Sequence, residues 1–131
     1  MTEPRLVGVG LHVSDLDRSV DFYTNVLGMR QVARHDFEGV TEVLVGYGVQ
    51  GESPSLVLVA RAGHPSPLEV GTGFDRVLLM VDDVRTTCEK LLAFGCDVTQ
   101  EPSELAGFPV LLAMAKDPDG YGLELLETRG S

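Results

Sequence analysis

Apolar and polar residues alternate along the chain in short runs that predict β-strands, and a helical pattern interrupts these runs twice. Residues 5–12 alternate as a pleated, half-buried strand does. Ser14 is a residue type that caps helices, and apolar residues then recur at helical spacing over 16–27 until Gly28 ends the pattern. Val- and Leu-rich strands are predicted next at 29–37, 41–45 and 55–60.

The same order of elements then starts again. The tetrapeptide 81–84 echoes the tetrapeptide 13–16 at an offset of 68 residues, between a predicted strand at 75–81 and a predicted helix at 85–94. Further strands are predicted at 97–100, 109–116 and 121–127, with a turn at 117–120. The chain is therefore predicted to be one domain over 1–131 that contains two βαβββ modules, module one at about 5–61 and module two at about 74–128, joined by a linker at 62–73.

Neither module is long enough to close a core comfortably, which favours an α+β fold in which two modules pair side by side. Their strands would form a curved, open sheet with the helices outside and a concave inner face, the kind of surface on which small molecules bind.

Composition and charge narrow the classes of partner. Of the 131 residues, 44% are hydrophobic and 23% charged, as in globular proteins, and the net charge of −10 disfavours nucleic acid and anionic membranes. No apolar run is long enough to span a bilayer, and no signal peptide is visible at the N-terminus, so a cytoplasmic location is expected. The only two cysteines, Cys88 and Cys96, are not spaced as zinc ligands and are expected to be reduced.

Three strings make the repeat specific: LHVSDLDRSVDFYTNVLGM at 11–29, VGYG at 45–48 and KDPDGYGLELLE at 116–127. With them the chain resembles the vicinal oxygen chelate superfamily, which includes glyoxalase I, bleomycin resistance proteins and extradiol dioxygenases. The likeness is to the glyoxalase I branch and covers essentially the whole chain. It implies paired modules that form a barrel-like cup, usually in a dimer.

The resemblance also implies a metal site and a chemistry. In the family, four inward side chains hold a divalent metal, one from the first and one from the last strand of each module, and substrates chelate that metal through two neighbouring oxygens. Glyoxalase I isomerises a glutathione hemithioacetal, whereas bleomycin resistance proteins bind and sequester a drug.

This sequence departs from the family's metal ligands at three of four positions. Counting seven residues back from the Asp that opens each helix gives Gly8 and Arg76 instead of histidine. The ligand position in the last strand of module one falls at about Leu58, and no residue from 56 to 60 can bind a metal. Only Glu124 matches a family ligand. A divalent cation needs several donors to offset its dehydration, so we expect no metal and no other cofactor.

His12, Arg76 and Glu124 are the candidate catalytic residues. His12 lies four residues after Gly8 on the same strand face and could exchange protons near neutral pH, with Glu124 as its carboxylate counterpart. A histidine at a strand end can equally be hydrogen-bonded to backbone. Arg76 and Glu124 are expected to approach each other, within or between subunits. Arg76 then either replaces the metal as a fixed cation that forks onto a carboxylate or carbonyl, or forms an ion pair with only a structural role.

A largely apolar pocket is expected beside these residues. Glycines on the first strand would leave room, and tyrosines in loops could line the pocket mouth, although a methionine on this face could simply pack in the core. The candidate substrate-binding residues are Gly8, Gly10, Leu58, Leu78, Met80, Tyr47 and Tyr121. The sequence does not decide which of His35, Asp36, Glu38 and Glu42 face the cup, and His64 is expected to be a solvated linker residue.

Three functions remain open. The first is a metal-independent protein that binds a small, largely apolar organic molecule, as drug-resistance relatives do. The second is a metal-independent isomerase, lyase or epoxide-opening enzyme that uses His12 and Glu124 as acid and base and Arg76 as electrostatic stabiliser. The third is a metal-dependent, lactoylglutathione lyase-like enzyme with unusual ligands. In each case the partner is a small molecule, and the protein is expected to be a homodimer.

Overall fold

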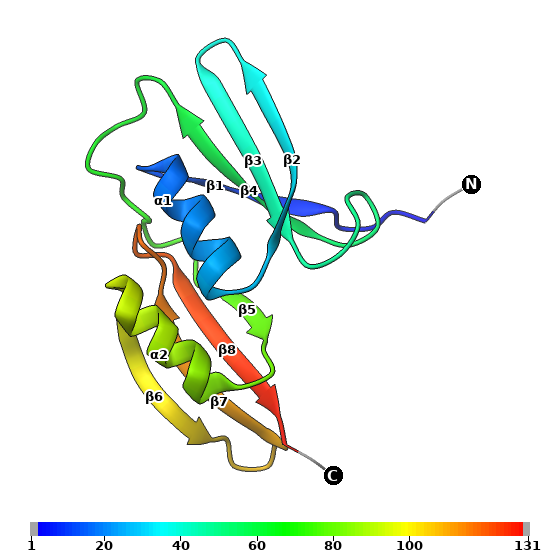
Figure 1. Ribbon diagram of the computed structural model, residues 1–131, viewed down its shortest axis with the longest axis vertical. Helices are drawn as coiled ribbons and strands as arrows, with labels where there is room; N and C mark the ends of the chain where they lie inside the picture. The colour runs from blue at the N-terminus through cyan, green and yellow to red at the C-terminus, as the bar shows by residue number, and fades with distance from the viewer. Residues whose placement is uncertain (1–2, 130–131) are drawn as a thin grey trace. The chain divides into compact units, whose positions relative to one another are not determined.

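A computed structural model describes residues 3–129 of the chain (Figure 1). The chain divides into two compact units, residues 1–68 and 69–131, and each unit contains one βαβββ module. The division falls inside the segment that the sequence predicts as a linker. Each unit is described by itself.

Module one is a four-stranded mixed sheet with one helical segment. The sheet order is β1-β4-β3-β2, in which β1 runs parallel to β4 and the other neighbours are antiparallel. The helical segment packs against β4 and β3. Its elements are β1 (Gly8–His12), α1 (Leu16–Asp21), a π-helical turn η1 (Phe22–Val26), β2 (Arg30–Phe37), β3 (Val40–Gly46) and β4 (Ser55–Arg61).

The core of module one lies between this sheet and the helical segment. Leu11, Val43 and Leu58 lie side by side on neighbouring strands, and each is no more than 4% exposed. Phe22 and Tyr23 are fully buried and meet edge to face at 5.1 Å. Because side chains alternate between the two faces of a strand, the residues next to this core row belong to the opposite face, which we call the open face of the sheet.

The helix of module one begins one residue later than the sequence suggests. Asp15, not Ser14, is the N-cap: its backbone is extended, and its carboxylate accepts a hydrogen bond from the Arg18 amide at 3.1 Å. The prediction of Ser14 as the cap is therefore wrong by one position. The predicted end at Gly28 holds, since this glycine has a φ of 73°, a conformation that side chains with a Cβ rarely adopt.

Module two repeats the plan. Its sheet order is β5-β8-β7-β6, with β5 parallel to β8, and Asp83 caps the helix as Asp15 does in module one. Gly95 ends the helix at a φ of 97°. The predicted strand at 97–100 extends further, to Glu104. The elements are β5 (Val77–Met80), α2 (Val84–Phe94), β6 (Val98–Glu104), β7 (Val110–Lys116) and β8 (Gly122–Thr128).

The α+β fold class and the twofold βαβββ order are confirmed, because each module places its strands and helix in the predicted sequence. Both cysteines are buried and free. Within residues 3–129, no helix is long and apolar enough to cross a membrane.

Candidate functional site

The strand register identifies the equivalent positions in the two modules. In module one Gly10 lies opposite Val57, and in module two Leu78 lies opposite Glu124. Leu78 is 68 residues after Gly10, which is the offset of the repeat. Val57 is therefore the counterpart of Glu124.

The prediction that placed Leu58 at this position is one residue out of register. Leu58 pairs with Leu11 and is 0% exposed, so it belongs to the core row beneath the helical segment and not to the open face. Its counterpart in module two is Leu125, which is also 0% exposed. The conclusion about the metal survives this correction, since Val57 has no donor atom either.

Arg76 and Glu124 meet within module two, as the sequence predicts. Arg76 Nε donates to Glu124 Oε1 at 2.5 Å, and Arg76 Nη1 donates to Asp75 Oδ2, also at 2.5 Å. The Glu124 side chain is only 14% exposed, whereas that of Asp75 is 82% exposed. Arg76 is thus held on two edges by two carboxylates, one largely buried and one in solvent.

This arrangement fixes the charge of the group. Hydrogen bonds from Arg76 to Asp75 and then to Glu124 raise the pKa of Arg76 above its already high value, so the guanidinium stays protonated. Two carboxylates and one guanidinium leave a local net charge of −1. Arg76 Nη2 has no partner among residues 3–129, so it remains available as a directed donor.

Gly8 and Gly10 differ in the space that they leave. A Cβ built on Gly8 would lie 2.8 Å from the Ser55 carbonyl oxygen, closer than real Cβ atoms come. A Cβ on Gly10 would meet only Val59 Cγ2, at an ordinary 3.9 Å. Gly10 therefore leaves room on the open face, as predicted. Gly8 does not: it allows two strands to approach each other closely.

The four positions at which the resemblance implies metal ligands do not fit a divalent cation. Gly8 has no side chain and no space for one, and Val57 is apolar. Arg76 brings a positive charge, and Glu124 already accepts from it. Within either module, no three His, Cys, Asp or Glu side chains gather as a metal site among the described residues.

His12 belongs to a second polar group, which lies in module one. Arg61 Nε donates to His12 Nε2 at 3.2 Å, and the His64 ring stacks on the His12 ring at 3.9 Å with an interplanar angle of 21°. Since arginine is always protonated, His12 Nε2 must be the acceptor, which assigns the neutral tautomer with its proton on Nδ1. Burial, and then the neighbouring His64 and Arg61, lower the pKa of His12.

The sequence reasoning missed Arg61 and described His64 as a solvated linker residue. Arg61 ends β4, two residues after Val59, the partner of His12, so only the parallel register brings it to His12. His64 is held near by its amide, which donates to the Arg61 carbonyl at 3.1 Å. His64 is partly exposed in the predicted linker, and its stacking on His12 is a contact that the sequence did not predict.

The register also sorts the four residues that the sequence leaves open. His35 pairs with Glu42, and Glu42 pairs with Val59, so both lie in the His12 row on the open face. Asp36 lies on the other face, where it accepts from Arg34 at 3.2 Å and from Thr41 at 3.1 Å. Glu38 lies in the turn between β2 and β3.

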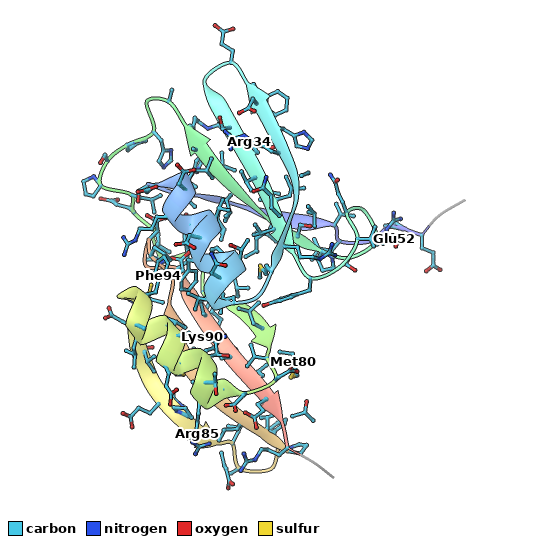
Figure 2. The ribbon with its side chains drawn as sticks, in the orientation of Figure 1. Arg34, Glu52, Met80, Arg85, Lys90 and Phe94 are labelled. Carbon is cyan, nitrogen blue, oxygen red and sulfur yellow. The ribbon has the colours of Figure 1, made fainter. Side chains whose placement is uncertain are left out.

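Leu78 and Met80 lie on the open face of module two and are 56% and 59% exposed. Figure 2 shows Met80 directed away from α2, and the Thr128 hydroxyl donates to its sulfur at 3.4 Å. Met80 is thus a surface residue of its module and not part of the core.

The two tyrosines have contacts inside their own modules. The Tyr47 hydroxyl donates to the Leu27 carbonyl at 2.5 Å, and burial raises its pKa. Tyr121 is buried and meets Phe74 edge to face at 5.3 Å. Contact of either tyrosine with a ligand stays a prediction.

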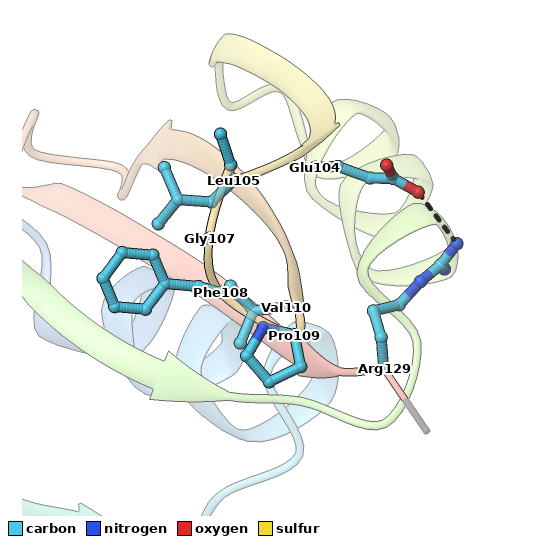
Figure 3. Close-up of a pocket in the computed structure, with 8 residues that line it drawn as sticks. Glu104, Leu105, Gly107, Phe108, Pro109, Val110 and Arg129 are labelled. Carbon is cyan, nitrogen blue, oxygen red and sulfur yellow. Dashed lines mark ion pairs between the residues drawn. The ribbon is translucent and has the colours of Figure 1, made fainter. Parts of the chain in front are cut away.

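A hollow of about 370 Å³ lies at the turn between β6 and β7 (Figure 3). Leu105 and Phe108 are exposed there, and Arg129 faces Glu104 across it at 3.8 Å. The ion pair is loose and solvent-exposed, so this hollow lacks the fixed polar groups of the Arg76 or His12 clusters.

Known proteins resemble the chain over nearly its full length. It is 36% identical over 127 residues to the lactoylglutathione lyase of Escherichia coli O157:H7, covering 95% of this chain and 93% of that protein. It is 34% identical over 131 residues to a Vibrio parahaemolyticus protein named "probable lactoylglutathione lyase", covering 98% and 94%.

Solved structures agree with these relatives. Glyoxalase I from Zea mays superposes with a TM-score of 0.86 at 30% identity, covering 97% of this chain, which spans 46% of the maize chain. The trypanothione-dependent glyoxalase I of Leishmania major gives a TM-score of 0.81 at 29% identity, covering 95% and 87%. The family model of the glyoxalase/bleomycin resistance protein/dioxygenase superfamily matches residues 5–125. The repeated module, the shared sequence and the shared fold together place the chain in that superfamily.

Proposed function

We propose that this glyoxalase-like protein binds a small, largely apolar organic molecule on the open face around Arg76 and Glu124, without a metal. The observation that carries the proposal is the ion pair between these two residues, at positions where the family holds its metal. A fixed guanidinium can polarise a ligand oxygen as a cation does, and it needs no coordination shell.

The chemistry of the Arg76 group favours an uncharged ligand oxygen, such as a carbonyl. Arg76 Nη2 can donate to that oxygen, whereas the net charge of −1 on Arg76, Asp75 and Glu124 opposes a carboxylate or phosphate. The exposed side chains of Leu78 and Met80 offer apolar surface for the rest of the ligand.

Transformation of the ligand is the catalytic form of the same proposal. Arg76 would polarise the carbonyl, and a carboxylate oxygen of Glu124 would remove or return a proton at the neighbouring carbon, an isomerisation or lyase step. His12 is the other candidate acid or base. It would act on a ligand held by Arg76 either of the same chain or of the second chain of a homodimer. Its Nε2 lone pair is occupied by Arg61, so His12 acts as a base only if that hydrogen bond opens.

The second candidate is lactoylglutathione lyase activity. Relatives with that name are 34–36% identical over 90–98% of this chain, a specific observation in its favour. Against this activity stand three of the four ligand positions. They are occupied by Gly8, Val57 and Arg76, which supply no ligand for the metal that the resemblance implies.

Two measurements separate these candidates. Native mass spectrometry of freshly purified protein reports bound small molecules, bound metal and subunit number together. We expect an organic ligand and less than about a tenth of an equivalent of metal. A hemithioacetal isomerase assay of methylglyoxal and glutathione, with Ni²⁺ or Zn²⁺ added, is expected to show no turnover above the uncatalysed rate.

Variants then test the role of Arg76. Arg76→Met should lose the organic ligand, whereas Arg34→Met, at an arginine paired with Asp36 in module one, should retain it. Metal-dependent isomerisation of the hemithioacetal by the purified protein would overturn the metal-free proposal. Ligand that stays bound to Arg76→Met would overturn the placement of the site. Equal turnover of that ligand by the native protein and by Glu124→Gln and His12→Ala would overturn the catalytic roles of these two residues. No turnover by the native protein would leave binding as the function.

A further inference from the structure

A groove lies between α2 and β6, on the face of the module-two sheet that α2 covers (Figure 1). It has a volume of about 460 Å³, within the range of roughly 300–1,000 Å³ that small-molecule pockets have. We call it the α2–β6 groove. β6 is the edge strand opposite β5, so the groove shares no residue with the Arg76 group and stands or falls independently of the proposed function.

The floor of the groove is apolar. Cys88 is 5% exposed, and burial raises the pKa of its thiol, so this side chain stays uncharged at neutral pH. Leu92 follows one turn later on the same side of α2 and is exposed. Val98 and Pro102 line the groove from β6 and are half-buried. These side chains offer apolar surface to the carbon atoms of a ligand.

Two carboxylates border this floor without a partner. Glu89 lies on α2 and Glu101 on β6, and within residues 3–129 neither side chain forms an ion pair or a hydrogen bond. Arg85 also lines the groove, one turn before Glu89. The order of a basic residue before an acidic one at this spacing is the less favourable of the two on a helix, and no ion pair forms. The groove therefore has a net charge of −1.

The rest of module two adds to this negative charge. Residues 69–131 contain 12 acidic and 5 basic side chains, a net charge of −7, whereas residues 1–68 contain 8 and 5, a net charge of −3. The field of such a module attracts a cation to the groove and repels an anion.

The irregularity of β6 argues against a peptide strand as the occupant. The pairing of β6 with β7 shifts register between Val98 and Gln100 and again between Gln100 and Ser103. Pro102 lies within the second shift and has no N–H to donate. Bulges and proline protect an edge strand from pairing with another chain. The occupant that fits is therefore a small molecule.

We propose that the α2–β6 groove binds a small organic cation, an ammonium or guanidinium group on an apolar body. The charged group lies between Glu89 and Glu101, where the carboxylates accept charge-assisted hydrogen bonds. The apolar body covers Leu92 and Val98. Arg85 lies about 10 Å from Leu92 along the helix, so the body extends away from Arg85 and the like charges stay apart.

NMR titration of the native chain tests the proposal with three compounds that share one alkyl chain: hexylammonium, 1-hexanol and hexanoate. Chloride keeps the ionic strength constant, and the amide signals of α2 and β6 are the readout. We expect saturable shifts with hexylammonium, an affinity about three- to tenfold lower for 1-hexanol, and no saturation with hexanoate. Equal affinity for the three compounds would overturn the preference for a cation. Shifts confined to other elements would overturn the site.

Matched variants separate the two carboxylates from the general charge of the module. Glu89→Gln and Glu101→Gln should each weaken hexylammonium binding about two- to fivefold, and Arg85→Gln should strengthen it by a similar factor. Glu104→Gln removes the same charge from the same strand, at a side chain that faces Arg129, and should bind hexylammonium as the native protein does. Equal weakening in Glu104→Gln and Glu101→Gln would assign the effect to the field of the module and overturn the site.

Two further measurements test the apolar floor and the occupant. Leu92→Ala should weaken the binding of hexylammonium and of 1-hexanol alike, because it removes apolar contact from both, and unchanged binding would overturn the placement of the body. Dilution of the native protein without any probe should leave the signals of α2 and β6 in place. Signals that move on dilution would mean that a second copy of the chain covers the groove, and would overturn a small molecule as its occupant.

Discussion

Module one and module two fill equivalent positions with opposite chemistry. Where β5 meets β8, module two has the ion pair between Arg76 and Glu124, and the matching positions of module one hold Gly8 and Val57. At the other end of the same strands the contrast reverses. Module one has the pair His12 and Arg61, whereas the matching pair in module two is Met80 and Thr128.

The difference shows what the shared backbone supplies. In both modules the parallel strand pair brings two residues together at each end of the open face, whatever their chemical type. The two arginines also have different surroundings, because two carboxylates hold Arg76 while a pair of histidines borders Arg61. One backbone plan therefore surrounds an arginine with carboxylates in module two and with imidazoles in module one.

The largest expected effect is a loss of stability that tests the strand register on which this comparison depends. Leu58→Ala should lower the free energy of unfolding by about 2–5 kcal/mol, because it empties a fully buried position. Val57→Ala, at the counterpart of Glu124, should cost about 1 kcal/mol. Urea denaturation measures both. Equal losses would contradict the equivalence of Val57 and Glu124.

Gly8 and Gly10 test whether module one could hold a side chain where module two holds Arg76. Gly8→Ala should cost about 1–3 kcal/mol, because its Cβ would press against the Ser55 carbonyl. Gly10→Ala meets only an ordinary contact and should change stability by less than about 0.5 kcal/mol. Thermal unfolding of the two variants gives the comparison, and a neutral Gly8→Ala would contradict the close approach.

Replacement of Arg76 and of Arg61 should affect stability differently, because only Arg76 pairs with carboxylates of its module. Arg76→Met strands the largely buried carboxylate of Glu124 and should lower the midpoint of urea denaturation. Arg61→Met strands no carboxylate of its module and should cost less than about 0.5 kcal/mol. The double variant Arg76→Met/Glu124→Leu should recover most of the loss. A double variant no more stable than Arg76→Met would mean that the guanidinium stem, not its charge, stabilises the module.

The smallest expected effect is a pH dependence confined to His12. Its pKa in the folded protein lies below the ordinary 6.5, so the unfolded chain takes up the proton first as the pH falls. The stabilisation from neutral His12 is therefore complete above pH 6.5 and declines below it. His12→Gln should reduce the loss of urea midpoint between pH 7.5 and pH 5.5. Its counterpart Met80→Gln should leave that loss unchanged, and an equal change in both variants would contradict the assignment.

The order of elements could be predicted from the sequence because each signal is local. Gly28 and Gly95 end the helices in a left-handed backbone conformation that favours glycine. The repeat of the tetrapeptide 13–16 at 81–84 shows where the second module begins its helix. The exact cap was harder, since Ser14 and Asp15 are both good capping residues. The meeting of Arg76 and Glu124 was predicted because the resemblance named both positions.

The missed features depend on register. Residues 56–60 are all apolar, so no alternation shows which of them face the helix, and Leu58 was chosen in place of Val57. The contact between Arg61 and His12 spans 49 residues and exists only through the parallel pairing of β1 with β4. No local pattern carries that information.

The close approach at Gly8 has a consequence for directed evolution. Selection for a metalloenzyme could exchange Val57 or Arg76 for a ligand by single substitutions within an unchanged backbone. A ligand at position 8 instead requires β1 and the start of β4 to separate first, because the Ser55 carbonyl occupies the space of its Cβ. The mutational route to a four-ligand site is therefore epistatic: a change near Ser55 must precede the one at Gly8, and libraries that vary the four ligand positions alone will miss it.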